Sequence, residues 1–146
     1  NAKILSETLK NNGFKIYSGG TDTHLMLVDL RPFNVKGNLA AESLSRANIT
    51  CNKNGIPFDS ESPMITSGIR LGSQAATTRG FGLKEFEKVG ELITKVIDGL
   101  SKNPDDNSKV ENGVRKEVIS LCSTFPIYKN LRKWFVQYVK KEKLQW

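Results

Sequence analysis

The run of residues 24–30, HLMLVDL, constrains the fold of this chain more than any other feature. Apart from its ends, the run is apolar at both odd and even positions. Successive side chains of a β-strand point to opposite faces, so this pattern predicts a strand that is covered on both faces. Pro32 follows the run and ends the strand, because proline has no N–H to donate to a sheet.

Helical periodicity before and after this run indicates further layers of structure. Apolar residues recur at helical spacing in several segments, a pattern typical of helices that bury one face. These helices are expected at residues 2–12, 38–47, 83–100 and 110–125. Further strands are expected at residues 14–17, 49–51 and 64–72. The order of strand, helix and strand in the first half of the chain predicts the fold class α/β.

Residues 49–80 gather the residue types of a ligand-facing loop. Asparagine and glycine at positions 52–55 favour turns, and prolines bracket the polar connection that follows. Arg70 then stands between Gly68 and Gly72 in a run of small residues. A guanidinium binds a carboxylate through two parallel hydrogen bonds, and glycines let a ligand approach the backbone. Arg70 is therefore the first candidate for a binding residue, and an arginine at a strand end that points into solvent is the alternative.

Short blocks of distinctive residues follow one another along the chain. The blocks are SGGTDTHL at residues 18–25, VDLR at 28–31, NKN at 52–54, TSGIRLG at 66–72 and TTRGF at 77–81. In order and spacing they resemble the carboxy-terminal domain of serine hydroxymethyltransferase, also called glycine hydroxymethyltransferase. That family belongs to the fold-type I pyridoxal-phosphate enzymes and interconverts serine and glycine, with tetrahydrofolate as the one-carbon acceptor. The resemblance implies that residues 1–128 form an α+β small domain, in which helices cover a small, mostly antiparallel sheet.

The resemblance also implies roles for residues in the central stretch. Arg70 matches the residue that binds the carboxylate of serine or glycine, in agreement with the chemistry of its guanidinium. Asn54 matches a position that contacts the folate ring system, where a side-chain amide can both donate and accept hydrogen bonds. An asparagine that holds a left-handed turn is the alternative for Asn54. Thr66, Ser67 and Gly68 are expected to support Arg70 by shaping the approach to it.

The catalytic residues of the family are not expected in this chain. Its cofactor, pyridoxal phosphate, requires a lysine that holds it covalently, a phosphate site and an aspartate on the pyridinium nitrogen. In the family these groups belong to a large domain that precedes the small one, and some come from the second subunit of a homodimer. Lys53 matches a position other than the cofactor lysine, and the guanidinium of Arg79 cannot replace an amine, so a structural ion pair is expected for Arg79. The chain alone is therefore expected to be inactive.

Cysteine and histidine usage excludes several kinds of site. Cys51 and Cys122 are too few for a disulfide framework and lack metal-ligand spacing, so both are expected to be reduced. His24 is the only histidine in the sequence, so a zinc site built on several imidazoles is excluded, and no catalytic triad is expected. A structural role at the strand edge is expected for His24. No metal is expected, and a reducing cytoplasm fits this usage.

Positive charge is concentrated at the end of the chain. Residues 128–146 carry +5 of the +7 net charge, so the preceding part is close to balanced and no nucleic-acid partner is expected there. No apolar run is long enough to span a bilayer, so a membrane partner is not expected either. At 146 residues an entire enzyme of this family would not fit, and the first residue is Asn1, so we expect a processed or truncated product.

Residues 129–146 are expected to form a basic amphipathic helical tail. The apolar residues Leu131, Trp134, Phe135, Tyr138 and Val139 recur at helical spacing, opposite a basic face. Such a helix either docks on its own domain or binds an anionic surface. The alternative function is thus a non-enzymatic α/β binding module, whose basic tail binds an anionic membrane, nucleic acid or an acidic protein.

Overall fold

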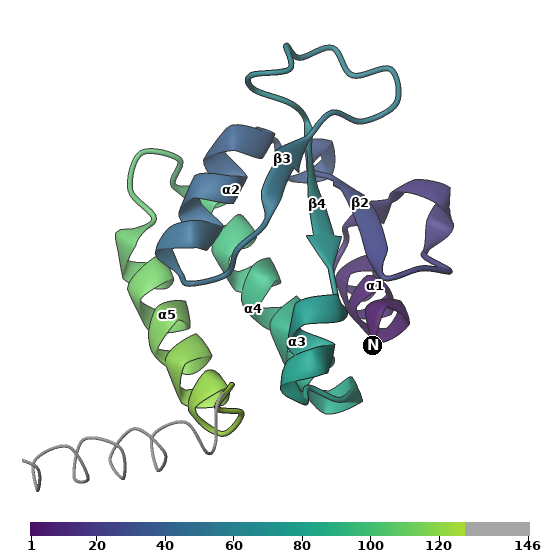
Figure 1. Cartoon of the computed structure of the whole chain (residues 1–146). Helices are drawn as coiled ribbons and strands as arrows, with labels where there is room; N and C mark the ends of the chain where they lie inside the picture. Colours follow the sequence, from purple (N-terminus) through teal and green to yellow (C-terminus); the bar gives the residue numbers. More distant parts are fainter. Residues whose placement is uncertain (128–146) are drawn as a thin grey trace, which may run out of the picture.

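The computed structural model describes residues 1–127, so the predicted tail at 129–146 lies outside the described part. The helices are α1 (Ala2–Asn11), α2 (Gly37–Arg46), α3 (Gln74–Arg79), α4 (Leu83–Lys102) and α5 (Ser108–Ser123). The strands are β1 (Lys15–Ile16), β2 (Leu25–Asp29), β3 (Asn52–Asn54) and β4 (Gly68–Gly72). Short 3₁₀ turns, η1 (Tyr17–Gly19) and η2 (Arg31–Phe33), follow β1 and β2. The predicted α/β class is confirmed (Figure 1).

The strands form one antiparallel sheet with the order β1-β2-β4-β3. Strand β4 pairs with β2 on one side and with β3 on the other, so it lies inside the sheet. In this register Arg70 stands opposite both Leu27 and Asn52. Directly opposed residues of antiparallel strands share a face, so the register decides which side chains meet.

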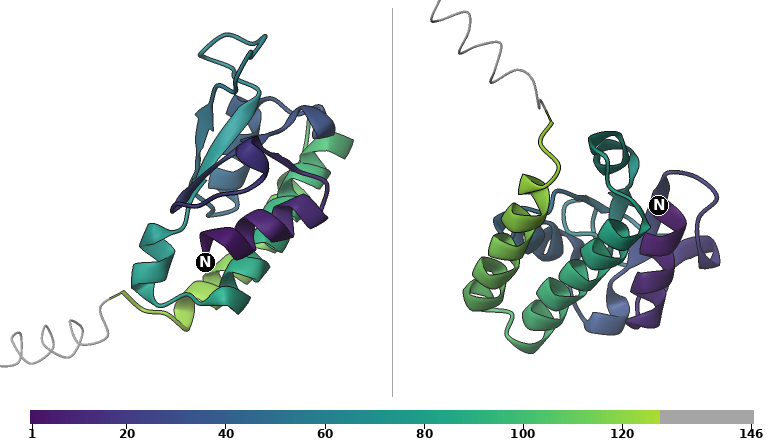
Figure 2. Two further views of the ribbon diagram at one scale, coloured as in Figure 1. Left: turned by 90° about the vertical axis from the view of Figure 1, so that its right-hand side faces the viewer. Right: turned by 90° about the horizontal axis from the view of Figure 1, so that it is seen from below.

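A layer of helices covers one face of this sheet. Helices α1 and α2 contact the strands, α4 packs across both of them, and α5 packs against α2 and α4. The left-hand view of Figure 2 shows this layer on one side of the sheet. Val28 and Ile69 lie in the core beneath it and are 0% exposed. Burial of each such side chain contributes about 1.5–3 kcal/mol, so this interface supplies most of the apolar stabilisation.

The opposite face of the sheet has no covering helix within residues 1–127. The prediction that β2 is covered on both faces is therefore wrong for the described part of the chain. Met26 and Val28 are buried under the helices, whereas Leu25 and Leu27, which alternate with them, are only half-buried. Apolar residues at both odd and even positions show that both faces of the strand are apolar. They do not show which element covers each face.

The end of α2 explains why residues 49–51 do not form the predicted strand. Asn48 has a φ of 64°, and the N–H of Ile49 donates to the carbonyl oxygen of Leu44 at 2.8 Å, which closes the helix. Residues 49–51 then carry the chain from the helix to the edge of the sheet. The prediction of a strand at residues 49–51 is therefore wrong, and β3 (Asn52–Asn54) forms instead at residues for which a turn was predicted.

Arg79 has a structural role at the end of α5, though not through the predicted ion pair. Its guanidinium donates to the carbonyl oxygens of Cys122, at 2.8 Å, and Phe125. These carbonyls belong to the end of a helix, where the helix itself leaves acceptors free. Arg79 ends α3 (Gln74–Arg79), so it links α3 to the end of α5.

A buried carboxylate links the outer helix α5 to α2. Glu111 accepts hydrogen bonds from Ser43 Oγ at 2.6 Å and from the guanidinium of Arg46 at 2.7 and 2.8 Å. The hydrogen bonds from Arg46 lower the pKa of Glu111, and they outweigh the opposing effect of desolvation. The charge of Glu111 is thus satisfied inside the helical layer.

Candidate functional site

Arg70 lies in the middle of the open face of the sheet. Its side chain is exposed and stands between Leu27 of β2 and Asn52 of β3. Arg31 and Arg46 each bind a buried carboxylate, whereas Arg70 has no carboxylate within 4 Å in residues 1–127. An unpaired guanidinium that is held by paired strands on both sides can accept a carboxylate in the bidentate geometry.

Gly68 is required by packing at the start of β4. A Cβ atom there would lie 2.6 Å from Ile56 Cγ2 and 2.7 Å from the carbonyl oxygen of Val28. Both distances are shorter than side chains tolerate, and a carbonyl oxygen cannot rotate away. The absence of a side chain at Gly68 therefore lets Ile56 and β2 approach the strand, two residues before Arg70.

Asn54 shares the open face with Arg70. It is the last residue of β3 and stands opposite Gly68, while Asn52 of the same strand stands opposite Arg70. Its side-chain nitrogen donates to the carbonyl oxygen of Gly55 at 2.8 Å. Asn54 is not among the residues with positive φ, so the alternative of a left-handed turn does not describe it. The structure thus brings Asn54 and Arg70 to neighbouring strands, and their ligands stay predictions.

Thr66 and Ser67 fix the chain where it enters β4. Both are buried, and Thr66 has a φ of 62° while its hydroxyl donates to the carbonyl oxygen of Gly68 at 3.1 Å. The Gly37 N–H donates to the carbonyl oxygen of Thr66 at 2.9 Å, and the Leu30 N–H donates to that of Ser67 at 2.9 Å. These bonds tie the entry of β4 to α2 and to the end of β2.

Asp59 was missed by sequence reasoning, although it is the main acceptor of the loop between β3 and β4. Its carboxylate accepts hydrogen bonds from the N–H groups of Ile56 (3.1 Å), Glu61 (3.0 Å) and Ser67 (2.9 Å), and from Ser67 Oγ (2.6 Å). Desolvation raises the pKa of Asp59, but these bonds outweigh it and the pKa is lowered. An aspartate in a loop rich in serine and proline was the available signal.

A second carboxylate braces the other side of the same loop. Asp29 is 1% exposed and accepts hydrogen bonds from Arg31 Nε at 3.0 Å and from its terminal nitrogen at 2.7 Å. Arg31 in turn donates to the hydroxyl of Tyr17 at 3.1 Å, and this hydroxyl donates to the carbonyl oxygen of Pro57 at 3.3 Å. Desolvation raises the pKa of Asp29, but the bonds from Arg31 outweigh it.

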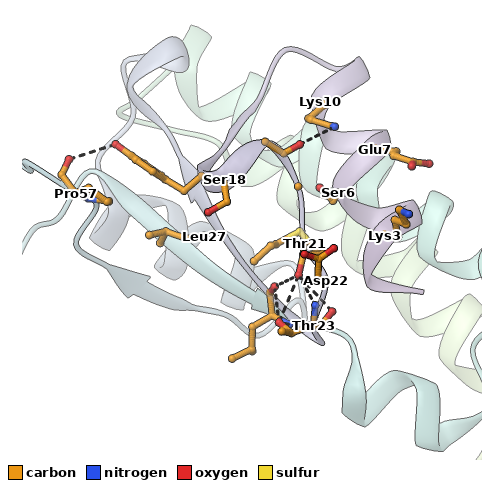
Figure 3. A pocket seen from close by; sticks show the side chains of 15 residues that line it. Lys3, Ser6, Glu7, Lys10, Ser18, Thr21, Asp22, Thr23, Leu27 and Pro57 are labelled. Atoms are coloured by element: carbon orange, nitrogen blue, oxygen red, sulfur yellow. Dashed lines mark hydrogen bonds between the residues drawn. The ribbon is translucent and has the colours of Figure 1, made fainter.

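A cleft of about 620 Å³ borders the site on the β2 side. Lys3 and Lys10 of α1 line it, together with Thr21, Leu27 and Pro57 (Figure 3). Leu27 is the direct partner of Arg70 in the sheet, so the cleft adjoins the open face.

His24 lies at the edge of β2, where a structural role was predicted. Its side chain is exposed beside a smaller hollow, while its carbonyl oxygen accepts a hydrogen bond from the N–H of Ser73 at 2.9 Å. The backbone of His24 thus links the start of β2 to Ser73, which follows β4.

Residues 1–127 contain neither a cluster of potential metal ligands nor a disulfide. No group of three or more His, Cys, Asp or Glu side chains there could hold a metal ion. Both cysteines are free, and burial raises the pKa of Cys51 to about 11. No helix in this range is both long and apolar enough to cross a bilayer.

The sheet, its single helical layer and the open face define a small α/β domain that presents Arg70 and Asn54 on neighbouring strands. A family model described as Serine hydroxymethyltransferase matches residues 1–93. The chain belongs to the serine hydroxymethyltransferase family, as its sequence blocks predicted.

Curated relatives extend this similarity over most of the chain. The chain is 87% identical over 132 residues to serine hydroxymethyltransferase from Pelagibacter ubique, which covers 90% of the chain and 30% of that protein. It is 62% identical over 128 residues to the protein of the same name from Paramagnetospirillum magneticum, covering 88% of the chain and 30% of the relative. The corresponding protein from Marinomonas sp. is 61% identical over 129 residues. The chain thus spans about 30% of the length of these relatives.

The family uses pyridoxal phosphate and tetrahydrofolate, and the described residues do not by themselves fit the first of these groups. Lys53, which is adjacent to Asn54, donates its side-chain amine to the carbonyl oxygen of Met64 at 2.7 Å. It therefore ties the loop between β3 and β4 rather than offering a free amine on the open face. No chemical step through this cofactor is assigned to the residues described.

Proposed function

We propose that this chain is the substrate and folate side of a serine hydroxymethyltransferase, which interconverts serine and glycine. One observation carries the proposal: Arg70, without a carboxylate partner in residues 1–127, stands on the open face beside the strand that ends in Asn54. Arg70 would bind the carboxylate of serine or glycine, and Asn54 would bind the ring system of tetrahydrofolate. Family membership and these two matched positions support both assignments.

Within this proposal the chain binds and orients the substrate and the folate, and another part of the enzyme supplies the reactive groups. The large domain would hold pyridoxal phosphate, whose bound form withdraws electrons from the substrate. Arg70 would fix the substrate carboxylate, because a guanidinium fork restrains rotation as well as distance. The isolated chain would be inactive. The complete enzyme would be a cytoplasmic homodimer.

The test uses a complete enzyme in which this chain is joined to the part of the Pelagibacter ubique relative that it does not cover. We expect Arg70→Ala to weaken glycine binding at least about 100-fold, because hydrogen bonds to charged groups contribute about 1.5–3 kcal/mol each. Arg70→Lys should recover only part of this, since an ammonium lacks the planar fork. Glycine titrations followed by cofactor absorbance measure both effects.

The matched control is Arg115→Ala, which removes an exposed arginine from α5. It should leave glycine affinity unchanged. Equal glycine affinity for the Arg70→Ala enzyme and the unmodified enzyme would refute the proposal. Loss of cofactor absorbance in the Arg70→Ala enzyme would also count against it, because Arg70 is assigned to the substrate alone.

The alternative function, a non-enzymatic module that binds through its basic tail, depends on residues outside the described part. Deletion of residues 129–146 separates the two functions. It should leave the activity of the joined enzyme unchanged if the chain is an enzyme domain, and it should abolish retention on heparin or anionic vesicles if the tail is the binding element.

A further inference from the structure

We propose that Asp59 is a positioning residue that holds Asn54 and Arg70 in register for their ligands. This inference rests on the proposed function. Within residues 1–127, Asp59 forms no hydrogen bond or ion pair with either of these two residues, and it acts through the loop that joins their strands.

The bonds of Asp59 connect the two ends of this loop. Ile56, which donates its N–H to the carboxylate, follows Asn54 by two positions, and Ser67, which donates both its N–H and its hydroxyl, precedes Arg70 by three. The carboxylate therefore closes a ring from the last residue of β3 to the entry of β4. A shift at one end of the ring is transmitted to the other through one hydrogen bond from Ile56 and two from Ser67.

Apolar burial holds this loop only at its base, where Ile56 is 5% exposed. The loop projects beyond the end of the sheet (Figure 1), and Phe58 and Met64 are 100% and 73% exposed. Phe58 also has a φ of 56°, a backbone conformation that costs about 1–2 kcal/mol in a residue other than glycine. A loop of this kind needs another source of order, and the carboxylate with four donors supplies it.

A further hydrogen bond connects the loop to the chain at the end of β2. Ser67 is 3% exposed, and its carbonyl oxygen accepts a hydrogen bond from the N–H of Leu30 at 2.9 Å, just beyond β2. The loop is thus fastened through Ser67 to the strand on the far side of Arg70. Asp59 therefore couples the loop to both strands that flank the binding face.

The first test compares Asp59→Asn with the unmodified residue in the joined enzyme described above. An amide keeps one acceptor oxygen but loses the charge, so several of the four bonds must weaken. We expect the dissociation constants of glycine and of tetrahydrofolate to rise about 10-fold each, with cofactor absorbance unchanged. The joint rise is the signature, since the two ligands are assigned to residues on different strands.

The matched control is Asp106→Asn. Like Asp59, Asp106 accepts a hydrogen bond from the N–H of the residue two positions later, here Ser108 at 3.0 Å. It lies just before α5 and away from the loop between β3 and β4. Its substitution should leave both dissociation constants unchanged. Ser67→Ala is a milder variant that removes only the 2.6 Å hydroxyl bond, and it should raise both constants in the same direction by a smaller factor.

The second test measures amide hydrogen exchange in the chain itself. Asp59→Asn should speed exchange at Ile56, Glu61 and Ser67 about 10-fold and leave the amides of α4 unchanged. Loosened loop amides with unaltered ligand affinities would overturn the inference, because Asp59 would then be structural only. Weakened ligand binding with protected loop amides would also overturn it.

Failure of the proposed function gives a different pattern. Arg70→Ala would then leave glycine affinity unchanged, whatever Asp59→Asn does to the loop. If Arg70→Ala weakens glycine binding and Asp59→Asn does not, the function stands and the positioning role of Asp59 is refuted.

Discussion

The two faces of the sheet are held in order by different forces. On the helix-covered face, apolar side chains such as Val28 and Ile69 are fully buried. On the open face, Arg70 is exposed, and the adjoining loop is held by hydrogen bonds to the carboxylate of Asp59 and is linked to Asp29 through Arg31 and Tyr17. The comparison teaches that apolar burial orders the covered face and hydrogen bonds order the loop beside the open face, so substitutions on one face should leave the other largely intact.

The strongest way to break the comparison is a large-to-small substitution in the covered layer. Phe86 is 2% exposed and packs in α4, so Phe86→Ala should lower the free energy of unfolding by about 3–5 kcal/mol. Urea denaturation followed by circular dichroism measures the loss. Arg70→Ala, on the other face, should stay within about 0.5 kcal/mol of the unmodified chain. A large loss for Arg70→Ala would show that the two faces are not independent.

Acid pH should sharpen the comparison by neutralising Asp29 and Asp59 near the open face, together with Glu111 in the helical layer. The folded-state pKa values of Asp29, Asp59 and Glu111 are lowered. Their stabilisation is therefore complete above the unfolded-state pKa values of about 4 and is lost as the pH falls through the lower folded-state values. Denaturation at a series of pH values should show stability decreasing below about pH 4. Asp59→Asn should flatten that decrease, and an identical pH profile would contradict the role of this carboxylate.

The smallest effect is expected at the tip of the loop. Phe58 is 100% exposed and has a positive φ, so Phe58→Gly relieves backbone strain while adding freedom to the unfolded chain. The two effects oppose each other, and we expect the free energy of unfolding to change by less than about 0.5 kcal/mol. Comparing the free-energy changes at Phe58 and Phe86 thus compares an exposed phenylalanine with a buried one. A loss above about 2 kcal/mol at Phe58 would mean that the loop is packed rather than projecting.

Periodicity predicted the covered face well and the open face poorly. The helix predicted at residues 83–100 is observed as α4 (Leu83–Lys102), because its apolar stripe determines which side is buried. The position of Arg70 in a strand between glycines was also predicted, from residue types that are local in sequence. Asp59 was missed because its role depends on Ser67, eight residues away, and no periodic pattern encodes a turn that brings the two together.

Gly37 is a residue distant in sequence whose lack of a side chain is required by the packing at the entry of β4. It starts α2 and its N–H binds the carbonyl oxygen of Thr66, at the entry of β4. A Cβ atom at Gly37 would collide with the hydroxyl of Thr66 and the carbonyl oxygen of Gly68. In a saturation mutagenesis experiment this helical glycine, remote from Arg70 in sequence, should therefore tolerate as few replacements as Arg70, the proposed carboxylate-binding residue.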